Sequence, residues 1–235
     1  MSSNDMKIES TCSEVENSNF FTDTAFIKKL EKNLVITKIS LDKQSLKGEI
    51  SIYTKEESSL SVNMPILENL GFDIDSEMGI VLSGKKSDFY CRKYFVKNVD
   101  DKKFLESKEN IAAIIDATSQ NLQDNSPLNA LAYLVNLTPR QIMLLNAIAT
   151  YEDQLLPALS EMMIKSALLS HYEVASYLVS YFEIKFDPTY TSRKKELKAL
   201  EEKIFAYLQT IDKINEDRVI RIFFNILKAL LRTNY

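Results

Sequence analysis

The sequence predicts an α+β protein, with a small β/α unit followed by a mainly α-helical region. All four glycines, Gly48, Gly71, Gly79 and Gly84, lie within one short stretch. Because tight turns between strands commonly use glycine, we expect strands only in the first half. From Asp101 onward, helical apolar periodicity and helix-capping residues dominate.

This pattern divides the chain into three segments. Residues 1–23 are rich in Ser, Asn and Glu, which predicts a disordered tail. Residues 24–100 form the predicted β/α unit, and residues 101–235 form the predicted helical region. With 45% hydrophobic and 26% charged residues, the chain is suited to bury a sizeable core.

The β/α unit is expected to contain five strands and one helix. Alternation of Ile50 and Ile52 with polar neighbours is typical of a strand. Ser61 is expected to cap the helix, and Gly71 to end it. The predicted strands are Leu34–Leu41, Gly48–Thr54, Phe72–Ile74, Gly79–Leu82 and Phe89–Val96.

The helical region is punctuated by capping signals. Thr138 with Gln141, and Ser170 with Glu173, have the spacing of a capping box. Short connections predict that neighbouring helices pack antiparallel. The predicted helices cover residues 103–122, 127–135, 139–154, 157–169, 171–183, 190–211 and 216–234.

The last predicted helix has the strongest amphipathic pattern. Asn215 is its expected N-cap, and acidic residues follow it. No turn or capping glycine follows the helix before the chain ends, so we expect its apolar stripe to need a companion that this chain lacks. The stripe consists of Val219, Ile222, Phe223, Ile226, Leu227, Leu230 and Leu231.

Composition excludes several classes of function. A net charge of −4 and a pI near 5.3 argue against nucleic-acid binding. No apolar run is long enough to span a bilayer, and the polar start of the chain is unlike a secretory signal. Cys12 and Cys91 lie far apart, which suits a reducing compartment. We therefore expect a cytoplasmic protein.

Two segments partly match ligand-binding motifs, and both matches fail. The segment Gly79–Lys86 has P-loop spacing, but Lys86 stands where the motif needs Ser or Thr, and a β-branched run fills the loop. Asp73, Asp75 and Glu77 resemble the start of a calcium loop. That loop needs Gly at its sixth position and Glu at its twelfth, and neither is present.

The remaining chemical candidates favour structural roles. His171 is the sole histidine and follows the predicted cap Ser170, so a helix-end role is favoured over catalysis. Acidic residues on the same helix offset the basic run Arg193–Lys195. Met162 and Met163 are expected in the core. The sequence therefore assigns no catalytic, cofactor-binding or metal-binding residue.

Four segments resemble a known enzyme family. They are Met64–Gly71, Pro139–Gln154, Leu168–Pro188 and Asn215–Tyr235. They are similar, in the same order, to segments of the very large bacterial NAD-specific glutamate dehydrogenases. The resemblance implies that the β/α unit is ACT-like and that the chain corresponds to a non-catalytic portion upstream of the catalytic domain.

The resemblance also implies a function. The family oxidatively deaminates L-glutamate to 2-oxoglutarate and ammonia with NAD, and its reaction needs a Gly-rich dinucleotide turn that this sequence lacks. We therefore expect a regulatory or structural fragment, or a split subunit, that binds no NAD itself. Its expected partner is the catalytic portion, or a second copy, through Val219, Ile222, Phe223, Ile226 and Leu230. A stand-alone amino-acid-sensing or protein-interaction module is the alternative.

Overall fold

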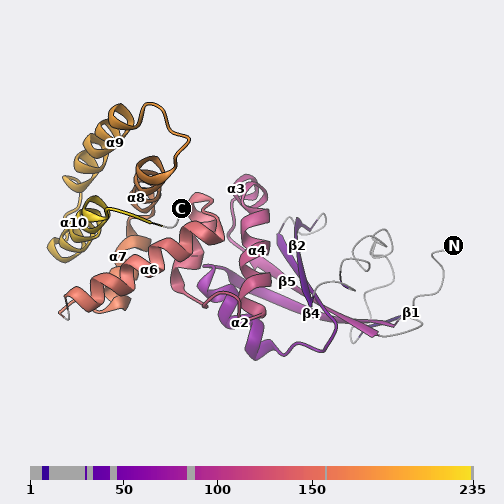
Figure 1. The fold of residues 1–235 in the computed structure, drawn as a ribbon. Helices are drawn as coiled ribbons and strands as arrows, with labels where there is room; N and C mark the ends of the chain where they lie inside the picture. The colour runs from indigo at the N-terminus through magenta and orange to yellow at the C-terminus, as the bar shows by residue number, and fades with distance from the viewer. Residues whose placement is uncertain are drawn as a thin grey trace. The chain divides into compact units, whose positions relative to one another are not determined.

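The computed structural model describes residues 7–10, 30, 34–42, 47–83, 88–156 and 158–233. The chain divides into two compact units, Met1–Asn125 and Ser126–Tyr235 (Figure 1). The first unit combines a sheet with helices, and the described part of the second is helical. The predicted α+β class is therefore confirmed.

The first unit is built on an antiparallel sheet with the strand order β1-β4-β5-β3-β2. Strand β3, helix α2 and strand β4 form a split β-α-β arrangement, because β5 lies between the two strands. The bounds of the strands are Lys7–Ser10 for β1, Val35–Leu41 for β2, Gly48–Thr54 for β3, Asp73–Ser83 for β4 and Asp88–Lys97 for β5.

Two strand predictions were wrong in detail. Lys7–Ser10 falls within the predicted disordered tail but pairs with β4 as strand β1. The separate strands predicted at Phe72–Ile74 and Gly79–Leu82 are one strand, β4. Pairing with β5 continues through the polar residues between them, with a register shift between Ile74 and Ser76. Strand β1 depends on pairing with β4, which lies far away in the sequence, whereas β4 is continuous because it pairs along its length with β5, the next strand in the chain. The local pattern of a single strand records neither pairing.

In the described ranges of the first unit, helices α2 (Leu60–Asn69), α3 (Asp101–Glu106) and α4 (Lys108–Ser119) accompany the sheet (Figure 1). A Cβ atom at Gly48 would lie 3.0 Å from the ring of Phe104 in α3. Asn63 in α2 donates a hydrogen bond to the Tyr94 hydroxyl on the sheet at 3.0 Å. Since α4 also packs on β2, the first unit extends to residue 125. The boundary predicted at residue 100 therefore lies too early.

Residues with positive φ show how the chain can make tight turns after Gly84, where it has no glycine. Gly71 has a φ of 82° and ends α2, as predicted. Asn98, Asn121 and Asn136 each have a φ of 54°. Asparagine tolerates the left-handed region better than other non-glycine residues. Among the described residues after position 84, asparagine therefore takes the positive-φ positions that glycine often occupies.

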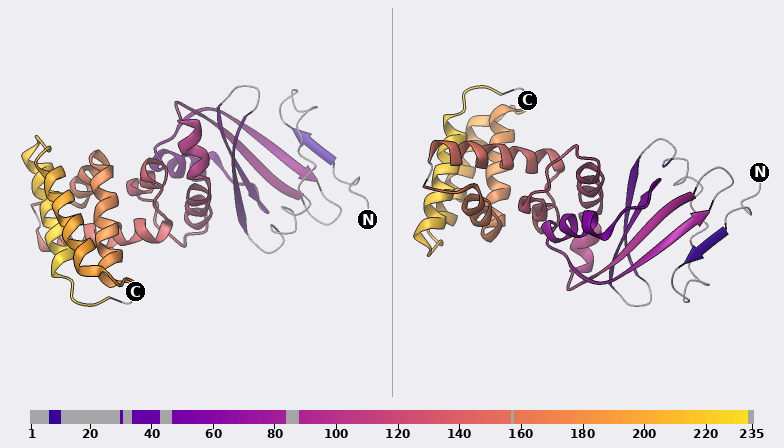
Figure 2. Two further views of the ribbon diagram at one scale, coloured as in Figure 1. Left: turned by 90° about the horizontal axis from the view of Figure 1, so that it is seen from above. Right: turned by 90° about the horizontal axis from the view of Figure 1, so that it is seen from below.

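The second unit consists of a short 3-10 helix and six α-helices among its described residues (Figure 2). The capping box of Thr138 and Gln141 is confirmed, but the one predicted at Ser170 is wrong, because His171 is the N-cap of α8. The helices are η2 Pro127–Ala130, α5 Leu131–Val135, α6 Pro139–Leu155, α7 Glu161–Ser170, α8 Tyr172–Phe186, α9 Arg193–Leu208 and α10 Ile214–Ala229.

Helix α10 corrects the expectation of a missing companion. Val219, Phe223, Ile226 and Leu227 of its apolar stripe are buried by the chain's own helices, because α10 packs against α6, α7, α8 and α9. Ile222 and Leu230 are partly exposed, and Leu231 is 90% exposed. The helix begins at Ile214 rather than after Asn215. Its buried residues are Val219, Ile220, Phe223, Phe224, Ile226 and Leu227.

Candidate functional site

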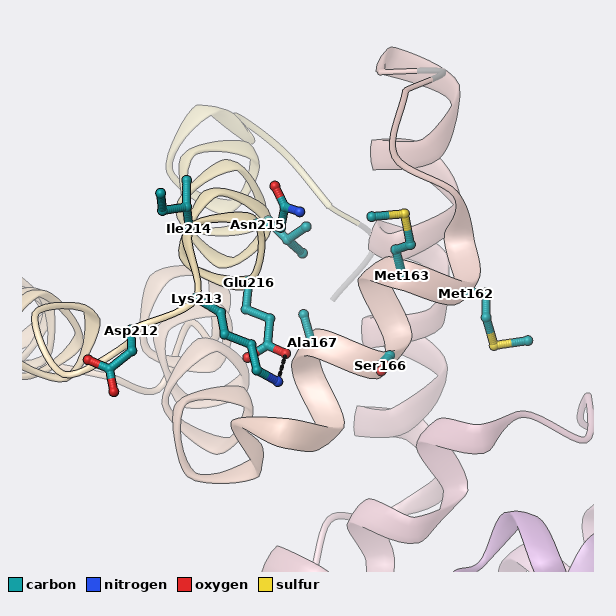
Figure 3. A pocket seen from close by; sticks show the side chains of 10 residues that line it. Met162, Met163, Ser166, Ala167, Asp212, Lys213, Ile214, Asn215 and Glu216 are labelled. Carbon is teal, nitrogen blue, oxygen red and sulfur yellow. Dashed lines mark hydrogen bonds and ion pairs between the residues drawn. The ribbon is translucent and has the colours of Figure 1, made fainter.

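A groove in the helical unit lies between α7 and the start of α10 (Figure 3). Its volume is about 770 Å³. Its lining comes from α7, from the connection between α9 and α10, and from the start of α10. The residues that line it are Met162, Met163, Ser166, Ala167, Asp212, Lys213, Ile214, Asn215, Glu216 and Val219.

The groove has an apolar floor and unusually exposed apolar walls. Ala167 and Val219 are buried beneath it. Met162 is 66% exposed, Met163 is 42% exposed and Ile214 is 82% exposed. Flexible methionines suit surfaces that adapt to a partner. Grouped exposed apolar side chains of this kind are typical of a contact surface.

This finding corrects one sequence prediction. Met162 and Met163 were expected in the core, but both are exposed on α7 and are among the residues that line the groove. Adjacent residues on a helix can both be buried, as Phe223 and Phe224 are in α10, so no local signal in the sequence marks these two methionines as exposed.

The polar side of the groove is held by charged hydrogen bonds. Lys213 donates to Glu216 Oε1 at 2.9 Å, and His171 Nε2 lies 2.9 Å from Glu216 Oε2. These bonds lower the pKa of Glu216, with the larger effect from Lys213. An ionised carboxylate can only accept, so His171 carries a proton on Nε2. In the neutral imidazole, Nδ1 then accepts from the Tyr207 hydroxyl, at 3.3 Å.

His171 therefore joins three segments of the helical unit. It stands between α7 and α8, and it contacts Tyr207 at the end of α9 and Glu216 at the start of α10. Its ring also packs edge-on against that of Tyr207. This geometry gives His171 a positioning role for the wall of the groove.

The two motif-like segments of the first unit lie along strand β4. Gly79 to Ser83 are extended and paired with β5, and Gly84 to Lys86 lie outside the described residues. Asp75 is bonded by Lys47 and by Lys97, which lower its pKa. Glu77 is paired with Arg92 at 3.1 Å. Cations of the protein itself thus engage these carboxylates.

The remaining candidates also have structural surroundings. Cys91 is buried, and burial raises the pKa of its thiol to about 12, which disfavours the reactive thiolate. Cys12 lies outside the described residues. Arg193 donates to the main-chain oxygens of Ile184 and Asp187, so it holds the turn before α9. Within the described ranges, no three His, Cys, Asp or Glu residues come together as a metal site.

In the part of the chain that the structure describes, no helix combines the length and the apolar character needed to cross a bilayer.

Comparison with known proteins identifies the family. Residues 123–188 match the family model described as glutamate dehydrogenase, helical motif 3. This range covers η2, α5, α6, α7 and α8, and Met162 and Met163 of the groove belong to α7.

Full-length relatives agree with the family match. The chain is 31% identical over 195 residues to the NAD-specific glutamate dehydrogenase of Pseudomonas aeruginosa, and 28% identical over 185 residues to that of Halomonas elongata. Each match covers 75% of this chain and 11% of the relative. A match to the Mycobacterium tuberculosis enzyme covers 46% of this chain and 7% of the relative, at 31% identity. The chain, which spans about a tenth of the length of these relatives, belongs to the family of the large NAD-specific glutamate dehydrogenases.

Proposed function

We propose that this chain supplies a non-catalytic, regulatory or structural part of an NAD-specific glutamate dehydrogenase, as a segment or as a separate subunit. The observation that carries the proposal is the similarity to enzymes of that name over 75% of the chain but only 11% of each relative. In this proposal the whole enzyme oxidises L-glutamate to 2-oxoglutarate and ammonia with NAD. The groups that bind both substrates belong to another part of it.

The groove between α7 and α10 is the proposed contact surface for the catalytic part. The stripe residues Val219, Phe223 and Ile226 are buried within the helical unit, so they are not available to a partner. Met162, Met163 and Ile214 are exposed and adjoin one groove. An apolar surface of the catalytic part would bury these side chains and gain the hydrophobic free energy of their removal from water.

The first test is enzymatic. The purified chain, supplied with L-glutamate and NAD, is expected to form no NADH, while the Pseudomonas aeruginosa relative serves as the active control. Glutamate-dependent NADH formation by the chain alone would contradict the non-catalytic assignment.

The second test exchanges parts. The Pseudomonas aeruginosa relative has a segment that matches 75% of this chain. We expect deletion of that segment to abolish activity or assembly, and replacement by the matching part of this chain to restore both. Full activity after the deletion would exclude a structural role.

The groove is tested within the same chimera. Substitution of Met162 and Ile214 by Asp is expected to reduce activity and assembly. Leu231→Asp is the matched control, because Leu231 is 90% exposed and does not line the groove. Equal behaviour of the groove variant and the control would place the partner surface elsewhere.

An amino-acid-sensing module is the second candidate function. Its support is the split β-α-β arrangement of β3, α2 and β4, the arrangement expected for an ACT-like unit. Calorimetric titration of the full chain with L-glutamate and other amino acids is expected to give saturable heat for one of them. The absence of saturable heat for every amino acid would reject this candidate.

A further inference from the structure

One acidic side chain is enclosed within the helical unit. Glu152 lies in the last part of α6, in line with the buried residues Leu145, Ile148 and Ala149. The residue is 0% exposed, and neither oxygen of its carboxyl group has a hydrogen-bond partner. An ionised carboxylate without hydrogen bonds or a countercharge is strongly disfavoured in such surroundings, whereas a neutral carboxyl is tolerated.

The helices that pack against α6 carry no cation committed to Glu152. These elements are η2, α5, α7, α8 and α10. Arg218 on α10 and Glu173 on α8 are exposed. On α6 itself, Arg140 is exposed near the N-terminal end, and Asp153 directly follows Glu152 in the sequence. Tyr151, also on α6, is exposed. Most of the other titratable groups are engaged with one another or with the main chain: Lys165 with Glu161, Arg221 with Asp217, Lys213 and His171 with Glu216, Lys185 with carbonyl oxygens of α10, Lys228 and Tyr181 with Glu201, Glu183 with Gln141, and Tyr177 with Lys203. Tyr133 and Tyr172 also have interaction partners.

Electrostatics agree with this geometry. Burial is the sole cause that raises the pKa of Glu152, to about 8. No nearby charge or hydrogen bond opposes the effect of burial. The carboxyl therefore remains protonated in the folded unit at neutral pH.

We propose that Glu152 is a proton-binding site of the helical unit, neutral in the folded state, and that its ionisation loosens the packing of the C-terminal end of α6. The unfolded chain releases this proton near the ordinary value for glutamate, about pH 4. The folded unit keeps it up to about pH 8. The folding equilibrium constant should therefore fall about tenfold per pH unit between these limits, and level off above them, where both states are ionised.

The test compares variants of the full chain by urea denaturation, monitored by far-UV circular dichroism, between about pH 5 and about pH 8. Glu152→Gln is expected to lose the pH-dependent fall, so that its stability relative to the wild type grows about tenfold per pH unit. Glu202→Gln is the matched control, since Glu202 is exposed on α9 and should parallel the wild type. Parallel curves for Glu152→Gln and the wild type would overturn the proposal.

A second variant and a direct measurement cover a failure to fold. Glu152→Leu removes the polar group and should show the same pH dependence as Glu152→Gln. If neither variant folds, infrared spectroscopy of the wild type at about pH 7 tests directly whether Glu152 is protonated, because a neutral carboxyl group has a carbonyl band of its own. At that pH Asp116, whose pKa burial raises to about 6, is mainly ionised. The presence of the band supports the protonated Glu152, and its absence contradicts it.

Discussion

The ammonium group of Lys185 donates a hydrogen bond to the main-chain oxygen of Leu230, at 2.6 Å. It also donates to the oxygens of Leu227 and Lys228, at 2.9 and 2.7 Å. The last carbonyl groups of a helix have no partner within the helix, and they carry partial negative charge. Lys185, in the last turn of α8, therefore caps the C-terminal end of α10. Burial, and to a lesser degree the charge of Lys228, lower the pKa of Lys185.

Removal of this cap should destabilise the helical unit. Lys185→Met keeps the aliphatic chain but leaves three carbonyl oxygens without their donor. We expect a loss of about 2 kcal/mol in the free energy of unfolding, measured by urea denaturation. Lys194→Met, at an exposed position on α9, should change it by less than about 0.5 kcal/mol. Equal stability of the two variants would show that the cap contributes nothing.

The other end of α10 is attached to α8 by the bond of His171 with Glu216, at 2.9 Å. Helices α8 and α10 therefore run parallel, with a bond between them at each end. Helix α9 connects them in the sequence. Glu216→Gln should lower the free energy of unfolding at neutral pH by about 1 kcal/mol, because charged hydrogen bonds from Lys213 and His171 are lost.

The same variant has a defined pH dependence. Because the folded-state pKa of Glu216 is lowered, its contribution is fully present above the ordinary glutamate value and disappears as the pH falls through the lowered value. The difference between wild type and Glu216→Gln should therefore be constant at neutral pH and shrink below about pH 4. Denaturation curves across this range provide the measurement. A difference that persists unchanged in acid would contradict the assigned ion pair.

The burial of α10 predicts unequal costs along its apolar stripe. Phe223 is 0% exposed, so Phe223→Ala should lower the free energy of unfolding by about 3 to 5 kcal/mol. Leu231→Ala, at a 90% exposed position, should change it by less than about 0.5 kcal/mol. Thermal and urea denaturation test both. A small effect of Phe223→Ala would mean that the stripe is not packed in solution.

Two glycines in the first unit offer a matched comparison. Gly71 has a φ of 82°, which costs a side-chain-bearing residue about 1 to 2 kcal/mol, so Gly71→Ala should destabilise the chain by that amount. A Cβ atom at Gly79 would meet no heavy atom within 4 Å. Gly79→Ala should therefore be neutral or slightly stabilising. The two midpoints of denaturation, measured together, check the difference.

Much of the secondary structure was predictable because its signals are local. The hydroxyl of Thr138 and the side chain of Gln141 form the predicted capping box, and Gly71 ends α2 through its backbone conformation. Strand β1 and the continuous strand β4 were missed. Strand β1 depends on pairing between residues far apart in the sequence, such as Ile8 with Leu82, and β4 continues through polar residues because it pairs along its length with β5.

The candidate site was less predictable than the fold. His171 was recognised as a helix-end residue, but its contacts with Tyr207 and Glu216 span 36 and 45 residues of sequence. In the sequence, nothing distinguishes Glu152 from the many other charged residues of the predicted helices. Only the packing around α6 reveals that its carboxyl group is buried and without a partner.

By itself, the sequence determined the α+β class, most of the helices and strands, and the resemblance to glutamate dehydrogenases, because periodicity, capping and residue order are written locally along the chain. Tertiary structure alone decided where the stripe of α10 lies. An amphipathic pattern indicates that one face of a helix avoids water, but it does not indicate which surface covers that face. In this protein, α6, α7, α8 and α9 cover it, and Met162, Met163 and Ile214 are left exposed instead.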